Sequence, residues 1–325
     1  MRAVRVHQFG DPSVLRLEEV PTPEPGPGQV LVRVEAIGVN PVDTYIRSGR
    51  YALLPSLPFV PGSDGAGTIA AVGTGVTGWK TGDRVFFHGT AGGRNVGAYA
   101  EMAVCNERHV YRLPANVGFA EGAAIGVPYA TAHRALFGRA NAQPNEIVLV
   151  HGASGGVGTA ALQLARWKGM RVMGTAGTEA GLELVRANGA HFAVNHKAAL
   201  YHDQIKEAAD RGRGPDVILE MLANENLDHD LDLLAPRGRI VVIGNRGRIE
   251  IDPRKTMTKE ASILGTALWN ADYDQLEGIY ADIITGLESG VLVPVIGTEL
   301  PLTEAPRAHD QVLAAGSYGK IVLLP

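Results

Sequence analysis

Apolar and polar residues alternate along the first 120 residues of the chain. The run QVLVRVEAIGVN, from Gln29 to Asn40, places every second side chain on one face, as a half-buried strand requires. Pro-Gly pairs such as Pro25-Gly26 and Pro61-Gly62 punctuate this region and mark turns. The pattern predicts a unit built mainly of β-strands.

The pattern changes near Phe119, where FAEGAAIGVPYATAHRALFGRA predicts helix. From Ile147 onward, short apolar runs recur between helical stretches, as βαβ units with a parallel sheet require. We expect six strands in one doubly wound sheet: Ile147–His151, Arg171–Thr175, Phe192–Val194, Asp216–Glu220, Arg239–Ile243 and Ser262–Ala267.

The segment after these strands predicts a different partner. It holds an amphipathic helix in DYDQLEGIYADIITGLESG, a strand near Val293–Ile296, a helix over Ala305–Ala314 and the closing run KIVLLP. A complete six-stranded sheet leaves KIVLLP nowhere to pair, so we expect roughly the last 50 residues to return to the β-rich unit. The predicted α/β organisation is a β-rich domain of residues 1–124 and 270–325 and a Rossmann dinucleotide-binding domain of residues 125–269.

Composition narrows the function classes. A formal net charge of -4, without a block of like charges, does not indicate a nucleic-acid partner. The start of the chain lacks the pattern of a secretion signal, and no apolar run is long enough for a bilayer, so we expect a cytoplasmic protein. The single cysteine, Cys105, excludes an intrachain disulfide and a four-thiolate zinc cluster; we expect it to be a small residue in a strand.

The segment EIVLVHGASGGVGTAALQLARWKGMRV, from Glu146 to Val172, reads as a strand, a glycine turn and a helix. Gly155 and Gly158 stand at the second and third positions of a Gly-x-Gly-x-x-Gly turn, while Ala153 replaces the first glycine. Such a turn brings backbone N–H groups close to a pyrophosphate at the helix start. The strand before it and the helix after it predict a dinucleotide site.

The end of the second predicted strand indicates which dinucleotide binds. This strand ends in Thr175-Ala176-Gly177 and lacks the carboxylate that binds the ribose hydroxyls of NAD. Glu179 comes later, where the next helix is expected to begin. The sequence therefore favours NADPH. His196 and Lys197, in VNHK, are the nearest donors for a 2'-phosphate; the alternative is that both are solvent-facing loop residues.

Five stretches together resemble the zeta-crystallin type of NADPH:quinone oxidoreductase, in the medium-chain dehydrogenase/reductase superfamily. They are GVNPVDTYIRSGRY, PGSDGAG, VHGASGGVG, GTAGT and DVILEMLANENL, and the resemblance covers essentially the whole chain. It implies a GroES-like catalytic domain, a Rossmann domain, reduction of quinones by one or two electrons, and a homodimer or homotetramer. Some bacterial relatives carry a lysine after the second strand; the place near Gly181 has none here.

Zinc dehydrogenases of this superfamily carry a cysteine and a Gly-His-Glu at two positions that this chain fills differently. Asn40 stands at the first, and Ser63-Asp64 at the second. Neither offers a thiolate or imidazole, so we expect no catalytic zinc. A quinone is electron-poor enough to accept hydride with only hydrogen bonds at its oxygens, which agrees with that expectation.

The resemblance also implies site residues. It assigns Asn40, Asp43, Tyr45 and Tyr51 to the nicotinamide and substrate pocket, in the loop after the strand that ends EAIGV. The residues it assigns to the cofactor are Tyr45, Thr131, Ser154, Gly155, Gly156, Val157, Gly177, His196, Asn226, Ile243, Gly244, Asn245 and Arg246. The two tyrosines could instead be half-buried aromatics with solvated hydroxyls, and Arg246 could simply cap an exposed loop.

Two other functions stay open at this point. A reductase of α,β-unsaturated carbonyl compounds would use the same fold, cofactor and zinc-free pocket. An RNA-binding or structural role is known among zeta-crystallin relatives, although the acidic balance of this chain argues against RNA as the main partner.

Overall fold

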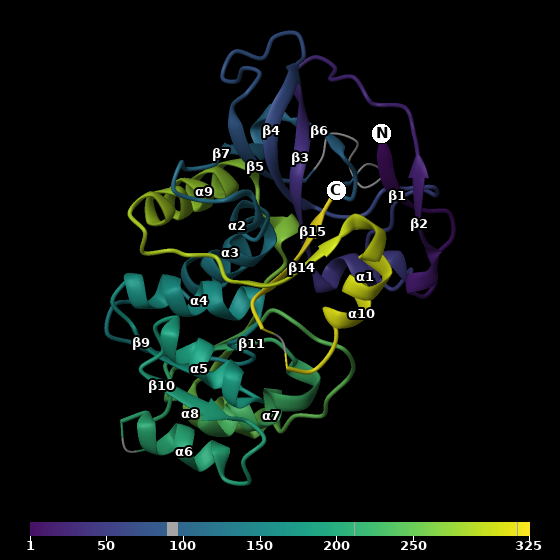
Figure 1. Ribbon diagram of the computed structural model, residues 1–325. Helices are drawn as coiled ribbons and strands as arrows, with labels where there is room; N and C mark the ends of the chain where they lie inside the picture. The colour runs from purple at the N-terminus through teal and green to yellow at the C-terminus, as the bar shows by residue number, and fades with distance from the viewer. Residues whose placement is uncertain (90–96, 211, 317) are drawn as a thin grey trace. The chain divides into compact units, whose positions relative to one another are not determined.

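The alternating residues of the first part of the chain form an antiparallel sheet (Figure 1). The computed structural model of the chain describes residues 1–89, 97–210, 212–316 and 318–325. The strand order is β14-β15-β3-β4-β5-β7, with β6 paired to β3. Here β14 (Ile296–Pro301) and β15 (Lys320–Leu324) pair in parallel, whereas the other neighbouring strands pair antiparallel. The strands from this part of the chain are β1 (Arg2–Val6), β2 (Leu15–Glu19), β3 (Gln29–Val39), β4 (Asp64–Val72), β5 (Arg84–His88), β6 (Met102–Asn106) and β7 (Val110–Arg112).

Strand β3 shows how the sequence pattern maps onto this sheet. Arg33 and Glu35 are exposed between buried residues, whereas Ile37, Gly38 and Val39 are all buried, so the end of β3 is covered on both faces. Cys105 lies buried in β6, and burial raises the pKa of its thiol, which confirms its interpretation as a small strand residue.

The C-terminal run returns to this sheet, as predicted. Strand β15 (Lys320–Leu324) pairs with β3 and with β14 (Ile296–Pro301), and Leu323 belongs to the core of the first unit. The strand predicted near Val293–Ile296 was placed too early, because Pro294 has no N–H for a ladder. Helix α10 (Ala305–Gln311) ends three residues before the predicted end.

The loop predicted after β3 is in fact a helix. Asn40 caps α1 (Pro41–Arg47), with Pro41 in its first turn and the Asp43 carboxylate accepting a hydrogen bond from the Asn40 N–H at 2.9 Å. These are the ordinary signals of a helix start. Asp43 and Tyr45 therefore lie on a helix rather than on a loop.

The second unit is built on the predicted doubly wound sheet. All six strands are parallel in the order β10-β9-β8-β11-β12-β13, and each lies within two residues of its predicted bounds. The strands are β8 (Ile147–Val150), β9 (Arg171–Ala176), β10 (Phe192–Asn195), β11 (Val217–Glu220), β12 (Arg239–Val242) and β13 (Ser262–Gly265). Figure 1 labels β9, β10 and β11 of this sheet among the teal and green helices α4 (Gly156–Trp167) to α8 (Pro253–Lys259).

Helices connect these strands and complete both units. They are α2 (Phe119–Ala123), α3 (Gly126–His133), α4 (Gly156–Trp167), α5 (Glu179–Ala187), α6 (Tyr201–Ala208), α7 (Ala223–Leu233), α8 (Pro253–Lys259) and α9 (Tyr273–Glu288). Short turns of other helix types span η1 (Pro12–Val14), η2 (Glu107–His109), η3 (Arg134–Arg139), η4 (Leu268–Asn270) and η5 (Leu302–Glu304). Within the described residues, no helix combines the length and hydropathy that a bilayer crossing needs.

The division between the units differs from the predicted domains. The first unit holds residues 1–127, 284–314 and 319–325, and the second holds 128–283 and 315–318. Residues 270–283, assigned from sequence to the β-rich domain, lie in the second unit. The reason is α9: Asp282 accepts a hydrogen bond from Lys168 at 2.8 Å and lies 3.0 Å from His133 Nε2, both residues of the second unit.

Candidate cofactor and active sites

The glycine turn has the geometry that a pyrophosphate site needs. Gly152 adopts a φ of +56°, and a Cβ at Gly158 would lie 2.5 Å from the Gly152 carbonyl oxygen. Only glycine lets α4 approach the turn so closely. Gly155 caps α4 and has no side chain to occupy the first helical N–H groups. These groups are therefore available to an anion.

The predicted donors for a 2'-phosphate gather at the end of β9. A Cβ at Gly177 would lie 2.7 Å from His196 Nε2 and 3.1 Å from Lys197 Cε. Burial, with the charges of His151 and Lys197, lowers the pKa of His196. Thr178 caps α5 and Glu179 begins it, as predicted for that acid. The structure thus brings Gly177, His196 and Lys197 together.

The predicted turn after β12 lies beside the start of α7. Gly244 must be glycine, because a Cβ there would lie 2.2 Å from the Met221 carbonyl oxygen. The Arg246 N–H donates to Asn224 Oδ1 at 2.8 Å. Asn226 Nδ2 donates to Glu220 Oε1 at 3.2 Å. Asn226 and the turn of Ile243, Gly244, Asn245 and Arg246 therefore meet around the end of β11.

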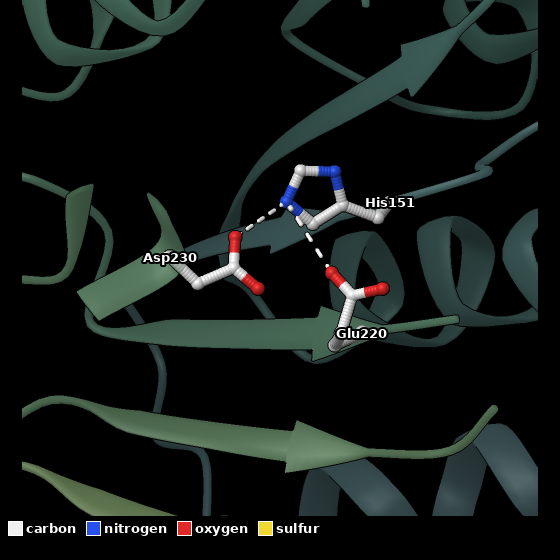
Figure 2. Close-up of side chains that lie close together, drawn as sticks. All are labelled: His151, Glu220 and Asp230. Atoms are coloured by element: carbon white, nitrogen blue, oxygen red, sulfur yellow. Dashed lines mark hydrogen bonds and ion pairs between the residues drawn. The ribbon is translucent and has the colours of Figure 1, made fainter. Parts of the chain in front are cut away.

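A buried ion cluster lies under the same strand ends (Figure 2). His151 Nε2 is 2.9 Å from Asp230 Oδ1 and 3.7 Å from Glu220 Oε2. On the other side of the ring, Nδ1 is 3.4 Å from Thr175 Oγ1, and this hydroxyl accepts a hydrogen bond from the Gly152 N–H at 3.2 Å. The cluster links the glycine turn to β9, β11 and α7.

The charges of this cluster follow from its burial. Burial alone would lower the pKa of His151, but the charge and hydrogen bond of Asp230 and the charge of Glu220 raise it to about 9. Burial raises the pKa of Glu220 to about 7. Within the described chain, this is the group of His, Cys, Asp or Glu whose donor atoms lie close enough for a metal, all within 4.8 Å. In this structure, His151 Nε2 is instead in hydrogen-bond contact with Asp230 Oδ1 at 2.9 Å.

The first unit holds a second buried polar cluster, around the start of α1. Asn40 Nδ2 donates to Asp64 Oδ2 at 2.9 Å, and Asn40 Oδ1 accepts from Lys320 Nζ. Asp64 also accepts from the Val127 N–H at 3.0 Å. Burial raises the pKa of Asp43 to about 7. Both polar ends of the Asn40 side chain are thus engaged within the protein.

The other residues assigned from sequence lie as follows. Tyr45 is half-buried on α1, and Tyr51 is half-buried in the segment after it. Ser154 is buried in the glycine turn, where Gly156 and Val157 begin α4. Thr131 is buried on α3, in the second unit. Their roles toward cofactor and substrate stay predictions.

Comparisons with known proteins agree with these two units. Residues 26–115 match the model of the alcohol dehydrogenase GroES-like domain, and residues 156–282 match that of the zinc-binding dehydrogenases. The quinone oxidoreductase of Rattus norvegicus is 51% identical over 100% of this chain and 98% of its own length. The chain belongs to the zeta-crystallin type of quinone oxidoreductase.

Solved structures support this membership of the quinone oxidoreductase family. The Escherichia coli quinone oxidoreductase complexed with NADPH has a TM-score of 0.88 at 29% identity, with 100% of both chains covered. An NAD-dependent alcohol dehydrogenase has a TM-score of 0.93 at 31% identity, also over 100% of both chains. The GroES-like and Rossmann architecture predicted from the sequence is therefore confirmed.

One of the matched family models describes zinc-binding dehydrogenases, but the residues of this chain do not fit a zinc site. Asn40 and Asp64 lie at positions that the resemblance relates to zinc ligands. Asn40 Nδ2 donates to Asp64 Oδ2, Asn40 Oδ1 accepts from Lys320 Nζ, and this ammonium lies 3.6 Å from Asp64 Oδ2. A divalent cation placed there would be repelled by that ammonium.

Sequence reasoning missed the residues that complete both clusters. Lys320 closes the α1 cluster from the last strand, and His151, Glu220 and Asp230 form the other. A signal for the second cluster was present, because His151 directly follows β8 and Glu220 ends β11, and these two strands are neighbours in the sheet.

Proposed function

We propose that this chain is a quinone reductase that takes hydride from NADPH without a metal. The observation that carries the proposal is the 51% identity, over the whole chain, with a protein named quinone oxidoreductase. NADPH supplies a hydride to an electron-poor acceptor. The protein then has to bind the cofactor, orient the quinone and stabilise the charge that develops on its oxygen.

The second unit supplies the cofactor site. The free N–H groups at the start of α4 suit the pyrophosphate, and no carboxylate follows β9 to favour NAD. His196 and Lys197, over Gly177, supply donors for a 2'-phosphate. This arrangement supports NADPH, although one structural neighbour is an NAD-dependent alcohol dehydrogenase.

The first unit supplies the groups for the quinone. Tyr45 offers a phenol hydroxyl as a hydrogen-bond donor, and Tyr51 lies in the next segment. Donors aimed at the oxygen before hydride transfer stabilise the charge that develops there. No general acid is obligatory, because a hydroquinone anion can take its proton from water after release. Asn40 and Asp43 act by placing α1, since their polar groups are held within the protein.

The decisive experiment is steady-state oxidation of NADPH with a small benzoquinone, run beside an enal and beside NADH. Gly158→Ala serves as the cofactor-site variant, because its Cβ would lie 2.5 Å from a backbone oxygen of the turn. Gly278→Ala is its matched control, since a Cβ there meets nothing within 4 Å. We expect benzoquinone turnover in the wild type and the control, and its loss in Gly158→Ala.

Two results would change the assignment. Turnover of the enal well above that of the quinone would make the chain a reductase of α,β-unsaturated carbonyl compounds. Absence of both activities, with salt-sensitive binding to RNA, would favour a binding role. The homo-oligomeric state and the cytoplasmic location stay predictions.

A further inference from the structure

A lysine from the last strand reaches the capped start of α1. Lys320 begins β15, and its side chain is 4% exposed. The strands β15, β3 and β4 are neighbours in the sheet, so their register brings Lys320, Asn40 and Asp64 to one end of it. Nζ donates to Asn40 Oδ1 and lies 3.6 Å from Asp64 Oδ2. The Lys320 ammonium is therefore the cation of this cluster.

The backbone of β3 is shaped to let this lysine pass. A Cβ at Gly38 would lie 3.0 Å from Lys320 Cε, 3.1 Å from Asp64 Cβ and 2.1 Å from the Ala123 carbonyl oxygen. Any other residue at this position would displace the lysine stem or α2. The glycine thus opens the path between Lys320 and Asp64.

We propose that Lys320 is a positioning residue for quinone reduction. It holds the Asn40 side chain by Oδ1, and Asn40 caps the helix that carries Tyr45. Asp64 holds the same side chain by Nδ2. Both polar atoms of the Asn40 side chain are thus bonded, and these bonds fix the orientation of the first turn of α1. This inference rests on the proposed function.

The charges around Lys320 explain why the ammonium is needed. Burial lowers the pKa of Lys320, and the charges of Asp64 and Asp43 oppose that effect. Burial would raise the pKa of Asp64, but the hydrogen bond of His88 and the charge of Lys320 lower it. Among the described residues, His88 Nδ1 lies 3.2 Å from Asp64 Oδ1, Tyr99 donates its hydroxyl to Asp43 at 3.5 Å, and His309 lies 3.0 Å from the same hydroxyl. The charge of Arg47 also acts on Tyr99. Without the ammonium, the buried carboxyls of Asp43 and Asp64 would lose the positive charge that opposes their mutual repulsion.

The test uses three full-length variants under the benzoquinone assay. Lys320→Met removes the ammonium and keeps most of the stem. Lys320→Met with Asp64→Asn also removes the buried carboxylate that faced the ammonium, so it restores folding if the single variant is unstable. Lys80→Met, at an exposed lysine of the same unit, is the control. Thermal unfolding, the Kd of NADPH and the pH profile of kcat/KM are measured for each.

Lys320→Met should lose about ten-fold or more in quinone kcat/KM, while the Kd of NADPH changes less than about two-fold. The acid limb of its pH profile should move to higher pH, because Asp43 and Asp64 lose the charge of Lys320, which lowers the pKa of both carboxyls. The double variant should regain stability but not kcat/KM, since Asn40 still lacks its donor.

Two outcomes would overturn this role. The first is wild-type kcat/KM in Lys320→Met, and the second is recovery of both stability and kcat/KM in the double variant. The wild type is assayed before any variant, because absence of quinone turnover there would refute the proposed function and not the role of Lys320.

Discussion

The buried imidazolium of His151 should make the stability of the Rossmann unit fall as the pH rises. Its pKa is about 9 in the fold, against an ordinary value of 6.5. A folded-state pKa that is raised gives stability that is complete below pH 6.5 and lost as the pH rises through 9. The difference corresponds to roughly 3 kcal/mol of unfolding free energy.

The neighbouring acid titrates in a lower range. The pKa of Glu220 rises from 4.5 to about 7, so its contribution is also present at low pH, and most of it is already lost at neutral pH. The range from about pH 7 to 10 therefore isolates the histidine. His151→Gln keeps an amide near Asp230 but cannot carry charge. It should be less stable than the wild type by up to about 3 kcal/mol at pH 7, and the difference should close near pH 10.

Urea unfolding at a series of pH values measures this difference. In a Trp79→Phe background the remaining tryptophans, Trp167 and Trp269, both report on the second unit. His229→Gln is the matched control, because this exposed residue directly precedes Asp230 on α7. Equal slopes of stability against pH for the wild type and His151→Gln would refute the reasoning. So would an NMR titration that places the pKa of His151 at or below 6.5.

Four further predictions concern cofactor, chemistry, metal and assembly. Tyr45→Phe should lower quinone turnover by about ten-fold or less, the scale of one hydrogen bond of roughly 1 kcal/mol; a thousand-fold loss with a steep acid limb would show that a proton donor is required. NADPH should bind more tightly than NADH by about 1 to 2 kcal/mol, and His196→Ala should narrow that gap; equal Kd values in the wild type would contradict the cofactor assignment. Purified protein should contain no stoichiometric zinc and keep its activity with a chelator, which elemental analysis and assay can check. The edge strand β13 should pair with its symmetry mate in a homo-oligomer, and light scattering that gives one chain's mass would exclude this.

The sheets could be predicted because their periodicity is local. Each buried strand of the second unit is an apolar run of a few residues, and the glycines of the turn mark where the first helix begins. The helix α1 was missed although Asn40, Pro41 and Asp43 carry its start signals, because seven residues are too few to show a helical period.

The two clusters were harder because they depend on register and helix phase. His151 and Glu220 could have been paired from the strand order alone, but Asp230 reaches them only through the rotation of α7. Lys320 could not be paired with Asn40 from the sequence, since only the register of β15 on β3 brings them together. The half-burial of Tyr45 likewise follows from how α1 packs, which its sequence does not specify.

The contact between Lys320 and Asn40 has a consequence for biosynthesis. The two residues are 280 positions apart, so at ribosomal rates the Asn40 cap waits roughly 15 to 60 s for its lysine. During that time the residues of the second sheet emerge as one continuous stretch and can fold, while β3 still has an open edge where β15 will pair. A nascent or prematurely terminated chain would therefore carry a finished nucleotide-binding fold beside an unpaired strand, and chaperones or proteases could recognise that strand.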